Sequence, residues 1–119
     1  DAESFLSDIK WANGYKCKKC GYNKYHQGKY TFSRKCKSCG YDESPTTHSL
    51  FEGIKFSTHK AMYITYVTFT FKSVSLTKLS EEIDLRLATV TNFNKKIQEQ
   101  KEFKKKNKHI VKNWVDLFF

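Results

Sequence analysis

The chain has 119 residues and a formal net charge of +10, with 22 lysines and arginines against 12 acidic residues. This length allows one ordinary domain or two very small ones, and either would bury only a modest apolar surface. The longest apolar run, residues 61–71, is well short of the roughly 20 residues of a membrane span. The positive charge therefore favours a polyanionic partner, nucleic acid first and an anionic membrane surface second.

The ends of the sequence bear on the cellular compartment. No signal peptide precedes Trp11, so we expect a soluble intracellular protein. The first residue is Asp1 and the sole methionine is Met62, which indicates a trimmed chain or a piece of a longer one. In a reducing compartment four cysteines are poor disulfide candidates, whereas closely paired thiolates suit a metal ion.

The basic residues form two blocks. Nine basic residues and no acidic one lie between Ile9 and Tyr41. Eight lysines lie between Lys95 and Lys112, diluted only by two glutamates. The segment between the blocks is rich in aromatic and β-branched residues, so the chain divides into basic, apolar and basic parts.

A repeated cysteine motif is the strongest signal in the sequence. Cys17-Lys-Lys-Cys20-Gly-Tyr recurs 19 residues later as Cys36-Lys-Ser-Cys39-Gly-Tyr. Two residues between paired cysteines let both sulfurs of one turn face the same ion, and the following glycine permits the backbone that closes the turn. We therefore predict one structural Zn²⁺ held by Cys17, Cys20, Cys36 and Cys39, with no open coordination position. Two disulfides, an iron site or a redox pair are the alternatives, and the four histidines are not needed as ligands.

Local patterns predict a hairpin and then a connector. Residues 29–35 alternate bulky and smaller side chains, which is typical of a strand, and Gly28 would close a hairpin before it. Pro45 ends any regular element, and residues 46–56 connect to the next segment. Ser57 or Thr58 could cap a helix there. The residues alone leave 61–71 open between helix and strand, because it is apolar on every side.

A pair of helices is predicted next. Leu76, Leu79 and Ile83 have helical spacing and form a short amphipathic helix. A tight turn at residues 84–86 follows, and helical spacing resumes with buried positions Val90, Phe93 and Ile97. The opposite face would expose Thr89, Thr91, Asn92, Lys95 and Lys96 to solvent. Two helices joined by about three residues indicate a helix-turn-helix.

With these motifs the chain resembles the amino-terminal region of bacterial insertion-sequence transposases, in which a zinc ribbon precedes a DDE nuclease domain. The resemblance runs from about Ser4 to Gln98. It rests on Phe5-Leu followed by Ile9-Lys-Trp-Ala-Asn-Gly-Tyr-Lys-Cys17, both Cys-x-x-Cys-Gly turns, Thr47-His-Ser-Leu-Phe-Glu52 and the helix pair ending at Lys96-Ile97. Asp84 stands where the family's turn has glycine, and aspartate tolerates the left-handed region.

The resemblance implies an α+β chain in which a zinc ribbon precedes a helical DNA-binding region that recognises terminal inverted repeats. We expect a short N-terminal helix and ribbon over 1–48, helices over 49–100, including 61–71, and a basic amphipathic helix over 101–119. It also implies a cytoplasmic, nucleoid-associated protein. The nuclease domain and its carboxylates do not follow within this chain, so we expect no enzyme activity.

The DNA contacts can be assigned by the geometry of a helix-turn-helix. The start of the second helix enters the major groove, and phosphates are met one turn further along and by the ribbon. The expected contacts are Arg86, Thr89, Thr91, Asn92, Lys95 and Lys96, together with Lys16, Lys18, Lys19, Arg34, Lys35 and Lys37 of the ribbon.

Alternatives remain for the whole chain and for its tail. A zinc-ribbon RNA-binding protein would use Tyr22, Tyr25, Tyr30 and Phe32 for stacking, and a protein-interaction adaptor would use the ribbon and tail. The tail would pack back on the helices, form a homodimer or begin another domain.

Overall fold

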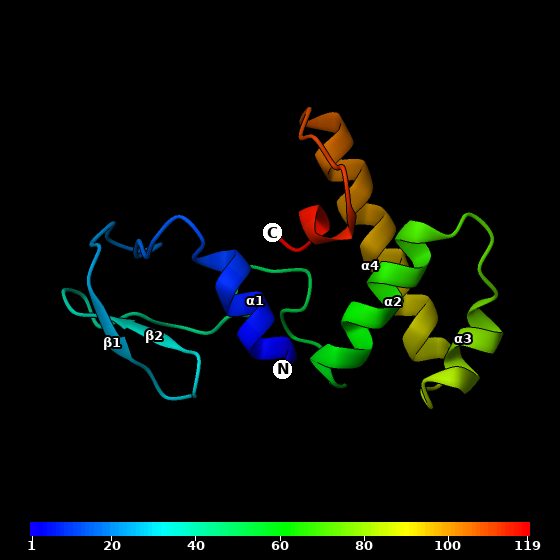
Figure 1. Ribbon diagram of the computed structural model, residues 1–119, viewed down its shortest axis with the longest axis horizontal. Coiled ribbons are helices and arrows are strands. Elements are labelled where there is room, and N and C mark those ends of the chain that lie inside the picture. Colours follow the sequence, from blue (N-terminus) through cyan, green and yellow to red (C-terminus); the bar gives the residue numbers. More distant parts are fainter. The chain divides into compact units, whose positions relative to one another are not determined.

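The computed structural model describes residues 1–119, and the chain divides into two compact units, Asp1–Glu52 and Gly53–Phe119 (Figure 1). The first unit contains one helix and a small antiparallel sheet, and the second is helical. The α+β composition expected from the sequence is confirmed. None of the helices is both long and apolar enough to cross a membrane.

The first unit begins with helix α1, Ala2–Lys10. The Asp1 side chain caps it by accepting a hydrogen bond from the amide of Glu3, and Lys10 stands in its last turn. Strands β1 (Tyr25–Gln27), β2 (Arg34–Cys36) and β3 (Asp42–Glu43) then form one sheet in the order β1-β2-β3, antiparallel throughout. These strands are too short to bury a large core by themselves.

The predicted strand over residues 29–35 is wrong for its first five residues. They form the turn of the hairpin between β1 and β2. The amide of Gly28 donates to the carbonyl of Ser33 at 2.9 Å, and the amide of Ser33 donates to the carbonyl of Tyr30 at 3.0 Å. The Asp42 carboxylate holds the turn from outside by accepting the amide of Lys29. These hydrogen bonds, two within the turn and one to Asp42, outweigh the alternating pattern that suggests a strand.

The core of the first unit surrounds two of its cysteines. Trp11, Tyr15, Cys17 and Cys36 are buried together, and Tyr41 packs against them. Lys10 adds a buried ion pair with Glu43, with 2.5 Å between Nζ and Oε2, and its ammonium also donates to the carbonyls of Ser44 and Thr47. The ion pair thereby ties α1 to the segment around β3.

The second unit begins with helix α2, Thr58–Thr70, which confirms the helix expected over 61–71. The side chain of Ser57 caps it by accepting the amide of His59, as predicted for Ser57. The hydroxyl of Thr65 is buried and donates to the carbonyl of Ala61 at 2.8 Å. The buried hydroxyl is thereby satisfied within the helix, and the burial of Ala61, Met62 and Ile64 supports a helix in a threonine-rich segment that propensity alone does not favour.

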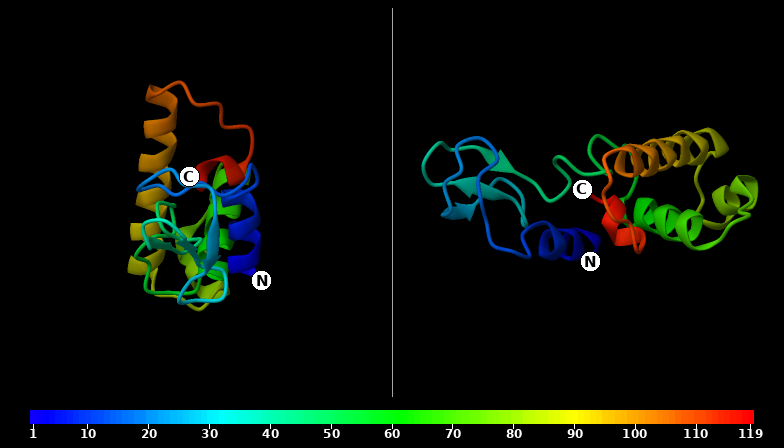
Figure 2. Two further views of the ribbon diagram at one scale, coloured as in Figure 1. Left: turned by 90° about the vertical axis from the view of Figure 1, so that its left-hand side faces the viewer. Right: turned by 90° about the horizontal axis from the view of Figure 1, so that it is seen from above.

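Helices α3 (Leu76–Glu82) and α4 (Leu87–Lys106) follow, and α4 lies beside α2 (Figures 1 and 2). Of the side chains expected inside, Leu79, Val90, Phe93 and Ile97 are buried, as predicted, whereas Leu76 and Ile83 are only half-buried. Asp84 in the linking turn has φ 56°, so the left-handed backbone expected of it is also confirmed.

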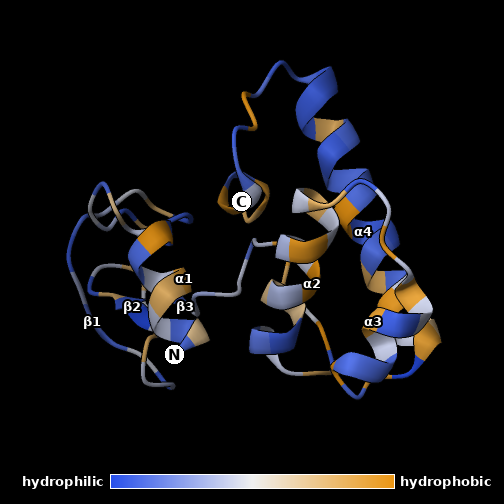
Figure 3. Cartoon of the chain, turned by 45° about the vertical axis from the view of Figure 1, so that its right-hand side comes forward, coloured by the Kyte–Doolittle hydropathy of each residue, from blue (hydrophilic) through white to orange (hydrophobic).

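The predicted helix over 101–119 is wrong beyond Lys106. Helix α4 ends there, and a short 3₁₀ helix, η1, forms over Trp114–Leu117. Lys108 has φ 57°, which a helix does not accommodate, and Asn113 with Asp116 caps η1 as a separate start. Figure 3 shows that the last turns of α4 are mostly hydrophilic, with one apolar band among them.

The tail after α4 packs back on the second unit. Leu117 and Phe118 are fully buried, and the Trp114 ring meets Tyr66 of α2 at 5.5 Å between centroids. Lys104 of α4 is itself buried and donates to the carbonyl of Phe119. The tail therefore packs back on the helices, which is one of the three options that the sequence left open.

Candidate metal centre

The two halves of the cysteine repeat fold into the same turn. In the first, the amide of Cys17 donates to Tyr22 and the amide of Gly21 donates to Cys17. In the second, the amide of Cys36 donates to Tyr41 and the amide of Gly40 donates to Cys36. Gly21 and Gly40 have φ of 80° and 77°, a conformation that side chains disfavour. The sequence repeat is therefore a structural repeat.

The four sulfurs of these turns meet in one cluster. The Sγ atoms of Cys17 and Cys39 lie 3.6 Å apart, those of Cys20 and Cys36 lie 3.5 Å apart, and all four lie within 4.8 Å of one another. These separations exceed the disulfide length of about 2.05 Å, and all four cysteines are unbridged. Four convergent thiols at this spacing can hold one metal ion.

Backbone amides prepare the buried sulfurs for the thiolate form. The amide of Lys19 points at Sγ of Cys17, and the amide of Ser38 points at Sγ of Cys36, each at 3.4 Å. Burial raises the pKa of Cys17, but the amides of Cys20 and Lys19 and the neighbouring thiols outweigh it and lower that pKa to about 6. The pKa of Cys36 is lowered by the corresponding amides, against the same effect of burial.

The pKa of Cys39, the exposed cysteine of the second turn, is shifted in the opposite direction. The amide of Tyr41 favours the thiolate of Cys39, but partial burial and the three nearby sulfurs outweigh it and raise the pKa of Cys39 to about 11. Clustered thiols cannot all ionise without a counter-charge, because their negative charges repel one another. A metal cation would supply that charge, and the four sulfurs could hold one.

Two lysines extend the repeat beyond the cysteines. Lys16 and Lys35 each precede the first cysteine of a turn, and each lies over the glycine of its own turn. Their Cε atoms lie 3.7 Å and 3.9 Å from the positions that a Cβ would take on Gly21 and Gly40. The repeated motif therefore extends to Lys-Cys-Lys-x-Cys-Gly-Tyr, and its first lysine covers the glycine of the turn.

The other predicted contacts of the first unit surround the metal cluster. Lys16, Lys18, Lys19, Lys35 and Lys37 are exposed. Arg34 is different, because it is half-buried and its guanidinium lies between two rings, 4.4 Å from the centre of Trp11 and 4.3 Å from that of Tyr25. Sequence reasoning grouped it with the surface lysines, although the structure gives it a fixed position.

The predicted contacts of the second unit gather at the start of α4. Arg86, Thr91, Asn92 and Lys95 are exposed there. Thr89 and Lys96 are half-buried, so the solvent-facing side is narrower than expected. Sequence reasoning omitted Leu87, an apolar residue that is 45% exposed on the same turn.

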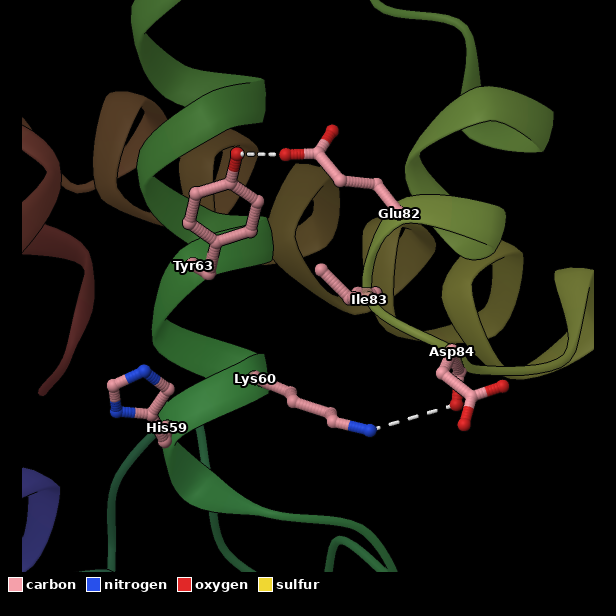
Figure 4. A pocket seen from close by; sticks show the side chains of 6 residues that line it. All are labelled: His59, Lys60, Tyr63, Glu82, Ile83 and Asp84. Carbon is pink, nitrogen blue, oxygen red and sulfur yellow. Dashed lines mark hydrogen bonds between the residues drawn. The ribbon is translucent and has the colours of Figure 1, made fainter.

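A cleft of about 540 Å³ lies between α2 and the end of α3 (Figure 4). The phenol of Tyr63 donates to Glu82 at 2.5 Å across it, and Lys60 reaches the carbonyl of Asp84 at 3.5 Å. These two hydrogen bonds, drawn as dashed lines in Figure 4, join α2 to α3 and to the turn that follows it. The hydrogen bond to Glu82 raises the pKa of Tyr63, because ionising the phenol would break it.

Comparison with known proteins adds no family to this description. No protein-family model, no curated protein and no solved structure matches the chain.

Proposed function

We propose that this chain is a zinc-stabilised DNA-binding protein, either the DNA-recognition part of an insertion-sequence transposase or a stand-alone relative of that part. The observation that carries the proposal is the convergence of the four repeated cysteines within a unit whose surface is lysine-rich. The helix pair of the second unit supplies the surface that would read the duplex. No nuclease chemistry is assigned to the chain.

Zinc fits the cluster by size and by donor type. A tetrahedral ion with Zn–S bonds of about 2.3 Å sets its sulfurs about 3.8 Å apart. The two closest sulfur pairs here lie 3.6 and 3.5 Å apart. Four thiolates leave no position for water or substrate, so the metal would be structural, with Cys17, Cys20, Cys36 and Cys39 as its ligands.

The second unit supports duplex recognition through α3, its short turn and α4. In a helix-turn-helix the start of the second helix lies in the major groove. Arg86, Thr91 and Asn92 are exposed at that end of α4, where an arginine can pair with guanine and an asparagine with adenine. Lys95 lies a turn further along and suits a phosphate.

Selection from a random duplex library tests the proposal directly. The zinc-loaded chain should enrich one motif, and Asn92→Ala should abolish the enrichment with zinc content unchanged. Gln98→Ala, a change of similar size at another exposed position of α4, is the matched control and should leave the motif intact. Failure to enrich any motif would refute sequence-specific duplex binding.

Salt dependence provides an independent measure of the footprint. If six to eight phosphates are engaged, the logarithm of affinity should fall with the logarithm of salt concentration with a slope of about −5 to −7. A slope near zero would mean that the lysines serve solubility and not DNA binding.

A second candidate function is binding of single-stranded RNA. It is favoured by three exposed tyrosines of the first unit, Tyr22, Tyr25 and Tyr30, which are 41%, 40% and 63% exposed. Exposed aromatic rings stack on unpaired bases. Competition between duplex DNA and single-stranded RNA of equal length separates the two functions.

A further inference from the structure

A pocket of about 230 Å³ lies within the first unit, away from the cysteines that carry the proposed function. The hairpin of β1 and β2 forms most of it, and Ser7 of α1 completes it. Its volume is below the roughly 300–1,000 Å³ of sites for drug-sized ligands. The pocket can therefore take only a small group, of about the size of a single ring system.

The side chain of Arg34 lines this pocket and is fixed in place without using its donors. Trp11 and Tyr25 lie on its two sides, with their ring centres 4.4 and 4.3 Å from the guanidinium carbon. No hydrogen bond or ion pair within the chain engages the guanidinium. An arginine held by aromatic faces presents its N–H fork in a set direction, at a low cost in side-chain entropy.

The rest of the lining is neutral. Tyr25 and Phe32 provide aromatic surface, Gln27 provides an amide, and Ser7, Thr31 and Ser33 provide hydroxyl groups. A free phosphate would be met by several converging cations, but Arg34 is the only charged residue in the lining. A carboxylate would leave the aromatic surface unused. A planar heterocycle with two acceptors on one edge can use both the Arg34 donors and the aromatic surface.

We infer that this pocket binds one unpaired guanine base of a nucleic acid strand. The Arg34 guanidinium would donate to the O6 and N7 acceptors of guanine, which is the pairing that arginine makes best among the bases. The aromatic surface of Phe32 would lie against the ring. The positive charge of the surrounding surface would attract the strand. This binding does not depend on the second unit recognising a duplex.

The test uses the zinc-loaded full chain and short labelled oligonucleotides, oligothymidylates with one central guanine or 7-deazaguanine. The analogue replaces only the N7 acceptor by C–H. Guanine should bind about tenfold more tightly than the analogue, which lies within the range that a bidentate arginine–guanine contact provides. Matched ribo-oligonucleotides show whether the strand is DNA or RNA. Equal affinity for guanine and 7-deazaguanine would overturn the inference.

Two variants assign the preference to the pocket. Arg34→Lys keeps the charge but loses the fork, so it should bind both oligonucleotides equally. Lys29→Gln removes an exposed charge of the neighbouring turn and should weaken binding to both oligonucleotides by the same factor. A guanine preference that survives in Arg34→Lys would overturn the inference, as would competition by an acidic peptide that is stronger than competition by the guanine oligonucleotide. The base-analogue comparison itself uses the unaltered chain, so it does not depend on the folding of a variant.

Discussion

The two units of this chain are stabilised in different ways. The first has helix α1, three short strands and a buried group that includes Cys17 and Cys36, besides the buried side chains of Leu6, Leu50 and Phe51. The second has three α-helices whose apolar side chains are buried without metal ligands among them. A unit of about 50 residues gains from a further source of stability, and its four clustered cysteines could supply one by holding a metal ion. We therefore expect metal removal to affect the first unit more than the second.

Metal removal should have the largest effect and should affect one unit. Structural zinc contributes on the order of 10 kcal/mol, so a strong chelator or Cys36→Ser should unfold the first unit and leave the second folded. The two tryptophans report separately, because Trp11 lies in the first unit and Trp114 in the second. Fluorescence of Trp11→Phe and Trp114→Phe during chelation therefore follows each unit. A simultaneous loss of both signals would contradict the separation.

The buried pair of Lys10 and Glu43 should rank next. Lys10→Met leaves the Glu43 carboxylate buried without a counter-charge, and breaking such a pair typically costs about 3–5 kcal/mol. Denaturant unfolding of the zinc-loaded chain, followed by Trp11 fluorescence, measures the loss. The double variant Lys10→Met with Glu43→Leu should regain part of it, because it removes both charges. If the single variant is as stable as the parent, the pair does not support the first unit.

A core truncation should act on the second unit alone. Ile97 of α4 is fully buried, and replacing a buried isoleucine by alanine typically costs about 2–5 kcal/mol. Ile97→Ala should lower the unfolding midpoint seen by Trp114 while zinc affinity stays unchanged. Ile110→Ala, at a position that is 76% exposed, is the control and should have little effect. A fall in zinc affinity in Ile97→Ala would show that the units are coupled.

Sequence patterns predicted what depends on local spacing. The cysteine turns are set by neighbouring residues, and the same holds for the Ser57 cap and the turn at Asp84. What the sequence missed depends on contacts between distant residues. Asp42 holds the turn that was predicted as a strand, and Lys10 pairs with Glu43 across 33 positions. The tail was predicted as a helix because its apolar spacing is helical, although the chain reverses before η1 to reach its packing site.

The same distinction applies to the candidate nucleic-acid contacts. Composition identified the basic residues, but it could not tell lysines that lie over the metal turns from lysines free to meet phosphate. Composition also gave no sign that Arg34 lies against Trp11 and Tyr25, because the three residues come from three separate segments of the chain. Net charge indicates a class of partner, whereas the placement of each charge depends on the fold.

The smallest effect concerns the brace between α2 and α3, which is the hydrogen bond from the Tyr63 hydroxyl to Glu82. Because the hydrogen bond to Glu82 raises the pKa of Tyr63, its stabilising effect should be complete below the ordinary tyrosine value of about 10 and be lost as pH rises through the raised pKa. The ring-carbon NMR signal of Tyr63 follows this titration. Glu82→Gln should return the pKa towards its ordinary value, while Glu81→Gln, one residue earlier, should not. If Tyr63 titrates alike in all three proteins, the brace is absent in solution, and the position of α3 depends on its packing against α4 alone.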